Sequence, residues 1–346
     1  MQKRKLLLGL LVASVVGHLL GDSSLIGQPA ESISQAQPPR AVQSCDSLAS
    51  LTLPNATITL AQVVSAGAPI TTPTPGGVTQ PIRASRELCR VAATLRPSSD
   101  SDIKIEVWMP ATNWNQKLQA VGNGAFNGTI AYAAMIAAIE RDYATASTDT
   151  GHVGNTAGFA LGRPEKVIDF GWRAVHEMTL TSKRIIAAYY QAGPRFSYWN
   201  GCSAGGRQAM KEAQRFPNDF DGIIAGAPGL DWTGRAAQAM RVLSVLETNE
   251  AARLTQRQRQ LLHGAVVAAC DGIDGVKDGL IENPQRCKFD PAALQCRGAD
   301  DAGCLTARQV DTARLIYSTA ITPNTKRAVN GQIGRASCRE RVYVLV

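Results

Sequence analysis

The sequence lacks the repeats and long apolar runs that mark fibrous proteins and polytopic membrane proteins. Its 31 glycines and 17 prolines follow no three-residue period, which excludes a collagen-like chain, and an apolar share of 45% excludes general disorder. No apolar run reaches the roughly 20 residues that a membrane-spanning helix needs. The 346 residues therefore predict a globular protein with one large core or two unequal domains.

Positive charge is in excess but is not concentrated. The formal net charge is +8, yet no basic run is interleaved with aromatic residues, so a nucleic-acid partner is not expected. No two cysteines have the C-x-x-C spacing of a zinc site or a thioredoxin-like redox site. Structural disulfides are therefore the expected use of the eight cysteines.

The N-terminus has the layout of a secretory signal peptide. Three cations at positions 3–5 precede a short apolar run over 6–16, and small residues at 34 and 36 offer a cleavage site. We expect residues 1–36 to be removed on export. The mature chain would then be secreted or periplasmic, with no membrane attachment.

Export changes the interpretation of the cysteines, because oxidising compartments favour disulfides. Spacing alone does not determine their connectivity, and near-neighbour pairing is the simplest arrangement. That arrangement joins Cys45 to Cys89, Cys270 to Cys287, and Cys296 to Cys304. Cys202 stands alone in the middle of the chain, and Cys338 lies near its end.

Alternating strand and helix signals up to about residue 232 predict an α/β domain. Residues 103–110 (I-K-I-E-V-W-M-P) alternate apolar and polar side chains, as in a half-buried strand closed by proline. Further strands are expected at 118–124, 143–148 and 195–200, and helices at 129–140, 172–191 and 207–216. This alternation favours a mainly parallel sheet with both faces covered.

The pattern changes after Trp232. Residues 233–320 give helix signals at 236–247 and 255–269, together with cysteine-rich loops and no comparably regular strand. We therefore expect an α/β domain over residues 37–232 and a second or inserted domain that begins near residue 233.

Residues 201–206 (G-C-S-A-G-G) contain the G-x-S-x-G pattern around Ser203. A strand is expected before it and a helix after it, which is the sharp turn that holds such a serine strained and exposes its hydroxyl. The backbone N–H of Ala204 would begin the helix, where negative charge on an oxyanion is stabilised. Ser203 is therefore the expected nucleophile and Ala204 an oxyanion-hole donor.

A serine nucleophile needs a base, and with this motif the chain order is Ser, acid, His. Only His263 follows Ser203, and its place on a helix of the second region favours a surface or structural role. His152 and His176 precede the serine and would require another order. The catalytic base is thus not expected among these residues.

Residues 198–208 (Y-W-N-G-C-S-A-G-G-R-Q), continuing through 215–217 and 220–228, closely resemble the tannase/feruloyl esterase family, which includes the hydrolase of mono(2-hydroxyethyl) terephthalate. Further matches lie at 122–124, 147–152 and 270–281. The resemblance runs from about residue 41 to about 325. It implies an α/β-hydrolase fold with a lid domain inserted after the nucleophile strand and helix, here the region 233–330.

The resemblance also implies that the catalytic Asp and His lie beyond the lid, and that a cysteine next to that His bridges to the cysteine beside the nucleophile. Cys202 matches the latter cysteine, and near-neighbour pairing leaves it alone. We therefore expect the chain to be incomplete at its C-terminus and inactive, or nearly so, as it stands. Residues 331–346 resemble a translated sequencing adapter and are expected to be a non-native tail.

Asp271, Asp274 and Asp278 crowd three carboxylates into a loop bounded by cysteines, where their repulsion favours a bound cation. The spacing is not that of an EF-hand, and a solvated acidic turn is the alternative. The resemblance implies a structural calcium ion held by these three side chains and by the backbone carbonyls of Val276 and Leu280.

The second oxyanion-hole donor is expected from the loop after an earlier strand, and Gly124 is the candidate. Asp149 and His152 are expected to support the C-terminal edge of the sheet rather than to react.

These expectations describe a secreted serine carboxylic ester hydrolase in which Ser203 forms an acyl-enzyme that water releases. The resemblance implies a small-molecule aromatic ester, with feruloyl-type esters of the plant cell wall first and gallate esters, as for a tannase, second. Two rival hypotheses stay open: a calcium-stabilised binding module with an unreactive serine, and an acyltransferase that uses the same turn.

Overall fold

The computed structural model describes residues 43–72, 82–298, 303–322 and 324–328. The expected signal peptide over 1–36, the expected tail over 331–346 and Cys338 lie outside these residues. Among the helices of the described ranges, none is both long and apolar enough to cross a membrane.

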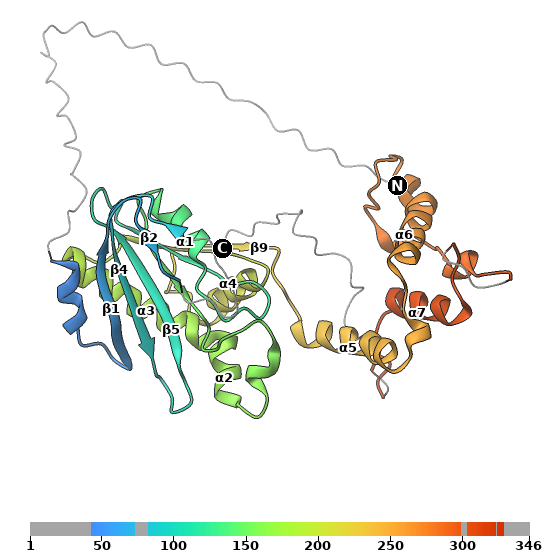
Figure 1. Ribbon diagram of the computed structural model, residues 1–346, viewed down its shortest axis with the longest axis horizontal. Coiled ribbons are helices and arrows are strands. Elements are labelled where there is room, and N and C mark those ends of the chain that lie inside the picture. The colour runs from blue at the N-terminus through green and yellow to red at the C-terminus, as the bar shows by residue number, and fades with distance from the viewer. Residues whose placement is uncertain (1–42, 73–81, 299–302, 323, 329–346) are drawn as a thin grey trace, which may run out of the picture. The chain divides into compact units, whose positions relative to one another are not determined.

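A β-sheet organises the first part of the chain (Figure 1). It has seven strands, in the order β1-β4-β5-β7-β6-β8-β9. Its strands are β1 Ala56–Val64, β4 Leu88–Leu95, β5 Ile103–Pro110, β6 Lys117–Val121, β7 Ala144–Thr148, β8 Phe196–Cys202 and β9 Gly222–Gly226. A small separate sheet pairs β2 Pro69–Ile70 with β3 Ile82–Arg83.

The sheet is mixed, which corrects the expectation of a mainly parallel one. β1, β4, β5 and β7 pair in antiparallel succession, whereas β7, β6, β8 and β9 pair in parallel. The connection between β4 and β5 gives a physical reason, because residues 96–102 are too few for the crossover that parallel neighbours need. The α/β class is confirmed, with strands close to the expected positions.

Helices pack on both faces of the sheet. Val107 and Trp108 are consecutive in β5 and therefore point to opposite faces. Trp108 shares a buried cluster with residues of α1 (Tyr132–Ile139), whereas Val107 shares another with residues of α3 (Ala174–Tyr190) and α4 (Ala204–Arg215). The core therefore lies in two layers, one on each side of the strands.

Two helix starts differ from the expected ones. α4 was expected from residue 207 and begins at Ala204, because Ser203 itself is the N-cap residue. α3 follows directly on α2 (Pro164–Ile168) and a π-helical turn over Asp169–Arg173, whereas one helix from residue 172 was expected.

The second region is helical, with α5 Trp232–Thr248, α6 Gln256–Cys270 and α7 Ala307–Tyr317. The expected helices at 236–247 and 255–269 correspond to α5 and α6, while α7 was not predicted. Both α6 and α7 begin with a capping box, in which a threonine and a glutamine three residues later satisfy each other's backbone N–H groups.

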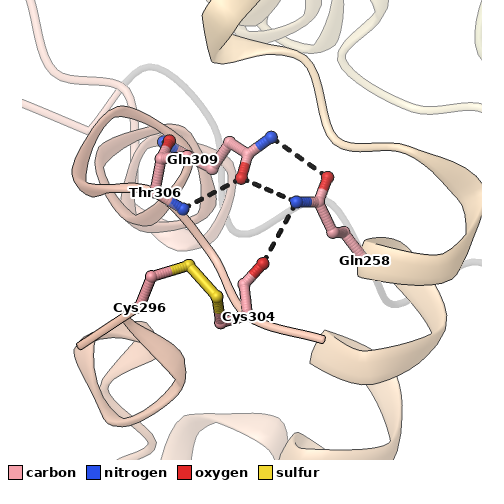
Figure 2. The surroundings of a disulfide bond; sticks show 5 residues. All are labelled: Gln258, Cys296, Cys304, Thr306 and Gln309. Carbon is pink, nitrogen blue, oxygen red and sulfur yellow. Dashed lines mark hydrogen bonds between the residues drawn. A yellow bond between two sulfur atoms is a disulfide. The ribbon is translucent and has the colours of Figure 1, made fainter. Parts of the chain in front are cut away.

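The two capping glutamines also join the helix starts to each other (Figure 2). The Nε2 of Gln258 donates to Oε1 of Gln309 (2.9 Å) and to the carbonyl of Cys304 (3.1 Å), and Nε2 of Gln309 donates back to Gln258 (3.0 Å). The Cys296–Cys304 disulfide lies beside this pair. The start of α7 is thus held by side-chain amides as well as by a covalent bond.

The disulfides follow the near-neighbour arrangement. Cys45 is bonded to Cys89, Cys270 to Cys287, and Cys296 to Cys304. Cys202 is a free thiol and is exposed.

Candidate active site

Ser203 lies in the turn between β8 and α4, with φ 62° and ψ −113°. A side chain in this conformation costs about 1–3 kcal/mol, so the turn must be held by its surroundings. The N–H of Ser203 donates to the carbonyl of Gly226 (2.9 Å), and the N–H of Gly229 donates to the carbonyl of Ser203 (3.0 Å). The end of β9 and the loop after it therefore hold the strained residue.

Glycines on both sides of Ser203 allow backbone to pack against backbone. A Cβ on Gly201 would lie 2.5 Å from the carbonyl oxygen of Gly205, and one on Gly206 would lie 2.4 Å from that of Gly226. Only hydrogen fits at these positions. The small residues of the motif are therefore required by the close approach of β8, α4 and β9.

Asn123, in the loop after β6, links the serine turn to its neighbouring strand. Its carbonyl accepts the N–H of Gly205 (2.8 Å), and its Nδ2 donates to the carbonyls of Thr148 and Thr129, both at 2.8 Å. Asn123 is buried, so each of these bonds satisfies a group that water cannot reach. The loop that contains Gly124 is thereby positioned against the start of α4.

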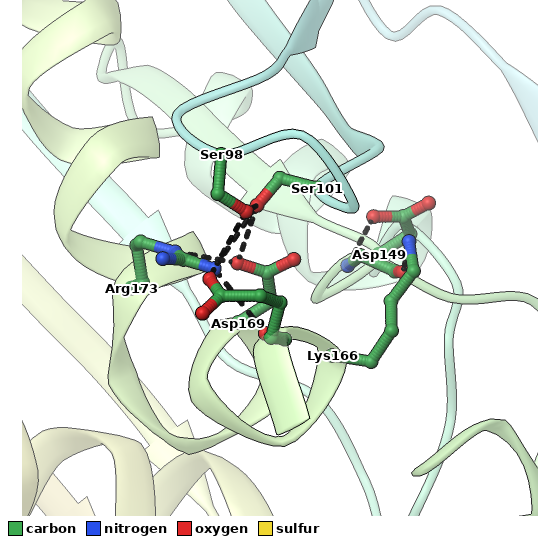
Figure 3. A network of polar contacts seen from close by, with 8 residues as sticks. Ser98, Ser101, Asp149, Lys166, Asp169 and Arg173 are labelled. Atoms are coloured by element: carbon green, nitrogen blue, oxygen red, sulfur yellow. Dashed lines mark hydrogen bonds and ion pairs between the residues drawn. The ribbon is translucent and has the colours of Figure 1, made fainter. Parts of the chain in front are cut away.

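The loop after β7 is held through Asp149 and Lys166 (Figure 3). Oδ1 of Asp149 accepts the backbone N–H groups of Lys104 (2.9 Å) and Gly151 (2.7 Å), and Nζ of Lys166 donates to the carbonyl of Gly151 (2.8 Å). Burial raises the pKa of Asp149 to about 7, against the lowering effect of the two N–H donors.

A second polar cluster in the same view holds the helical turn before α3 (Figure 3). Asp169 is fully buried and accepts hydrogen bonds from Nε of Arg173 (2.6 Å) and Oγ of Ser101 (3.0 Å). Arg173 also pairs with Glu165 (2.7 Å). Gly151 packs against Asp169, where a Cβ would meet the Asp169 side chain at 3.1 Å. The two clusters together therefore fix the loop after β7.

His152 connects this loop to the one after β6. Its Nε2 lies 2.7 Å from the carbonyl oxygen of Phe126, and since a carbonyl can only accept, Nε2 carries the proton. The ring stacks on Phe159 at 3.7 Å, and burial lowers the pKa of His152, which favours the neutral ring. His152 thus occupies the supporting position expected from the sequence.

A cavity of about 370 Å³ lies beside Ser203. It is lined by the loop after β6, by the loop before α5 and by the first turns of α5, through Ala125, Phe126, Ser203, Gly229, Trp232, Arg235, Ala236 and Ala239. Phe126 and Trp232 meet edge to face, with ring centroids 4.8 Å apart. The serine therefore faces a space with an aromatic border.

Arg207 supports this border from α4. Its guanidinium lies over the rings of Phe170 (4.6 Å) and Trp232 (5.8 Å) and donates to the carbonyls of Phe170 (3.2 Å) and Gly171 (3.1 Å). Burial lowers the pKa of Arg207 to about 10, which still leaves it charged at neutral pH. The charged guanidinium of Arg207 therefore makes cation–π contacts with two aromatic rings near the serine.

The structure brings together some of the expected site residues and leaves others apart. Ser203 and the loop of Gly124 border one cavity, but among the described cavity-lining residues there is no histidine. His176 pairs with Asp219 instead, and His263 lies on α6. The contributions of Phe126, Trp232 and Arg207 were not predicted, because no local pattern distinguishes them from core residues.

The acidic loop of the second region has its carboxylates turned to backbone N–H groups. Asp274 accepts from Val276 (2.9 Å), Asp271 from Gly279 (2.9 Å) and Asp278 from Leu280 (3.0 Å). Asp274 and Asp278 are exposed. Carboxylate oxygens are ligands that calcium accepts, but in the described residues the ligand atoms of these three side chains do not all lie within 4.8 Å of one another.

Comparison with known proteins finds a matching family and relatives that are named as esterases. The profile described as tannase and feruloyl esterase matches residues 89–343. An uncharacterized esterase of Xanthomonas campestris pv. campestris is 40% identical over 285 residues, 82% of this chain and 48% of that protein. A protein of Aspergillus fumigatus named "Probable feruloyl esterase B-1" is 34% identical over 246 residues, 70% of this chain and 46% of that protein.

The crystal structure of feruloyl esterase B from Aspergillus oryzae superposes with a TM-score of 0.75 at 32% sequence identity, over 84% of this chain and 58% of that one. The chain thus spans about half the length of the curated relatives it matches. The family match ends at residue 343, inside the segment 331–346 that was expected to be a non-native tail. That expectation stays a prediction, because residues 329–346 lie outside those described. The strained serine turn, the mixed sheet that carries it and these matches agree, and the chain belongs to the tannase and feruloyl esterase family.

Proposed function

We propose that the protein is a secreted serine carboxylic ester hydrolase in which Ser203 forms the acyl-enzyme. The observation that carries this proposal is the strained conformation of Ser203 at the start of α4, beside a cavity. Strain of this kind persists only where the surroundings impose it, and it presents the hydroxyl to a substrate carbonyl.

The oxyanion would lie at the start of α4, where the helix dipole favours negative charge. Ala204 is the first residue of that helix, and its N–H is the proposed first donor. Gly124 is the proposed second donor, because the loop that contains it is fixed to Gly205 through Asn123. The hydroxyl of Ser203 attacks the ester carbonyl, the alcohol leaves with a proton, and water then releases the acid from the serine.

The proposed substrates are esters of aromatic acids, feruloyl esters of plant cell-wall sugars before gallate esters. The support is the aromatic border of the cavity, where Phe126 and Trp232 offer a face and an edge to a planar acyl group. The names of the feruloyl esterase relatives agree with this class. The base that activates Ser203 is proposed to come from residues outside those described, since no described histidine lines the cavity.

A fluorophosphonate probe tests the nucleophile directly, because it phosphonylates only an activated serine. In the complete gene product, we expect wild type to be labelled at Ser203, Ser203→Ala to be unlabelled, and Ser244→Ala, which changes an exposed serine of α5, to be labelled as wild type. Equal labelling of all three complete proteins contradicts the proposal, and labelling of none of them contradicts it in favour of a binding module. Product analysis with an added alcohol separates hydrolysis from acyl transfer.

Calcium at the acidic loop is proposed as a structural ion, held by Asp271, Asp274 and Asp278 with the carbonyls of Val276 and Leu280. Its support is the concentration of three carboxylates in a short loop closed by the Cys270–Cys287 disulfide. Chelation is expected to lower the unfolding temperature of wild type but not that of Asp274→Asn, which has lost a ligand. Glu282→Gln, which changes an exposed carboxylate next to the loop, is the control and is expected to respond as wild type. An equal response of all three proteins contradicts the site.

Secretion and the domain division are proposed together. The three disulfides suit an oxidising compartment. N-terminal sequencing of protein recovered outside the cytoplasm tests whether the mature chain begins after residue 36. Limited proteolysis tests the proposed boundary between residues 37–232 and 233–330, with a cut expected near residue 233.

A further inference from the structure

Three ionisable side chains meet at the end of α4 remote from Ser203. They are His176 of α3, Glu212 of α4 and Asp219 in the turn before β9, and one possible ligand atom from each lies within 4.8 Å of the others. Among the described residues this is the one such group of three. Nδ1 of His176 lies 2.7 Å from Oδ2 of Asp219.

Within the described ranges, Glu212 has no donor for either of its carboxylate oxygens. Its exposed fraction is 0%, and neither Oε1 nor Oε2 has a hydrogen-bond partner among the described residues. Asp219 is also buried, at 6%. An ionised carboxylate in such a place costs several kcal/mol unless a cation or proton compensates it.

Two nearby cations make no ion pair with the carboxylates of the cluster. The guanidinium of Arg215 lies over the ring of Trp172 at 4.3 Å, and Nζ of Lys183 donates to the backbone carbonyl of Asp219 at 2.5 Å. In the described residues no ion pair reaches Glu212. The buried carboxylate of Glu212 is therefore left without a directly paired cation among the described side chains.

We propose that His176, Glu212 and Asp219 bind a divalent transition-metal ion of the Zn²⁺ type. One imidazole nitrogen and two carboxylate oxygens form a ligand set that Zn²⁺ and its neighbours accept, whereas Ca²⁺ prefers oxygen alone. A dication compensates both carboxylates at once. The alternative is a proton shared between Glu212 and Asp219, in keeping with the pKa of Glu212, which burial and the neighbouring Asp219 raise to about 8. The ring of His176 is already fixed by stacking on Phe216 at 3.7 Å, so little freedom is lost on binding.

The ion would join three separate elements. α3, α4 and the turn before β9 each supply one ligand, and α4 is the helix whose first residue follows Ser203. The proposed role is therefore structural, holding the nucleophile helix from its far end. It does not depend on ester hydrolysis or on the calcium loop.

Isothermal titration with Zn²⁺ alone, on untagged protein stripped with a chelator and then saturated with Ca²⁺, tests the site. Saturating Ca²⁺ keeps the acidic loop from competing. We expect one equivalent of Zn²⁺ to bind to wild type, with X-ray absorption showing nitrogen and oxygen ligands and no sulfur, and the unfolding temperature to rise on binding. A sulfur ligand, which the free thiol of Cys202 would supply, overturns the proposal.

Variants assign the ligands. Glu212→Gln is expected to weaken Zn²⁺ binding by more than about tenfold, since even indirect ligand supports contribute that much. Glu177→Gln, next to His176 but outside the cluster, is expected to bind as wild type. Should Glu212→Gln fail to fold by circular dichroism, His176→Phe, which can keep the stacking on Phe216, decides the question. No binding by wild type, or unchanged binding in the folded ligand variants, overturns the proposal and leaves a shared proton between the carboxylates.

Discussion

Asn123 and Gln208 bind each other through two reciprocal hydrogen bonds. The backbone N–H of Asn123 donates to Oε1 of Gln208 (3.1 Å), and Nε2 of Gln208 donates to Oδ1 of Asn123 (3.0 Å). Gln208 is on α4, one turn after Ser203, and Asn123 is in the loop proposed to supply the second oxyanion donor. The pair therefore sets the distance between the two halves of the proposed oxyanion hole.

Gln208→Glu keeps the size of this side chain but removes its donor. Two oxygens would then face each other in a buried place, so we expect a loss of about 1–3 kcal/mol in the free energy of unfolding and slower labelling by the fluorophosphonate probe. Gln214→Glu, at an exposed position of the same helix, is expected to stay within about 0.5 kcal/mol. Urea unfolding checks both, and equal values would show that the pair contributes little.

Replacing Ser203 by two different residues measures the strain of the turn. Ser203→Ala and Ser203→Gly both remove the hydroxyl, and they differ only in a Cβ at φ 62° and ψ −113°. Because glycine adopts this conformation readily, Ser203→Gly is expected to be the more stable by about 1 kcal/mol, after the larger chain entropy of glycine is deducted. A Ser203→Ala protein that matches or exceeds it in chemical denaturation would mean that the turn is not strained.

Replacing each of two helical glycines by alanine is expected to change the free energy of unfolding in opposite directions. At Gly206 the new Cβ would lie 2.4 Å from the backbone oxygen of Gly226, which cannot move freely, so overpacking outweighs helix propensity and costs about 1–3 kcal/mol. At Gly264 of α6 none of the described neighbouring atoms lies within 4 Å, and helix propensity alone adds about 0.5–1 kcal/mol. Thermal or urea unfolding of Gly206→Ala and Gly264→Ala checks the two signs.

Asp149 makes stability depend on pH near neutrality. Its pKa is raised to about 7 in the fold, from 3.8, so between these values the folded protein binds a proton that the unfolded chain has released. The stabilisation of the fold by this bound proton is complete below about pH 4. It declines as the pH rises and is lost once the pH has passed about 7. The free energy of unfolding of wild type relative to Asp149→Asn is therefore expected to fall between pH 5 and 7, by at most about 1.4 kcal/mol per pH unit, and to level off above pH 7.

Asp102→Asn is the control for this pH dependence. The hydrogen bond from Lys104 lowers the pKa of Asp102, so this carboxylate is ionised in both states above pH 5 and its difference curve is expected to be flat. Parallel curves for wild type and Asp149→Asn over the same range would show that Asp149 does not take up the proton.

Much of the candidate site was predictable because its signals are local. The turn around Ser203 depends on small residues within a few positions, and the strand before it and the helix after it follow from short patterns. Near-neighbour cysteine pairing also proved correct, because each disulfide closes a segment whose ends the adjacent elements bring together.

Contacts between distant segments were not predictable in the same way. The antiparallel half of the sheet depends on which strands pair, and the meeting of Phe126 with Trp232 depends on how two loops pack. No periodicity in the sequence contains that information, since pairing is chosen by the total burial of the chain rather than by neighbouring residues.

The sequence by itself thus determined the family, the α/β class and the serine turn, because each rests on residues adjacent in the chain. Only the tertiary structure decided that His152 would hold Phe126 and that His176, Glu212 and Asp219 would share one buried place. These residues come from separate elements, and His176 and Glu212 meet because α3 and α4 pack on the same face of the sheet.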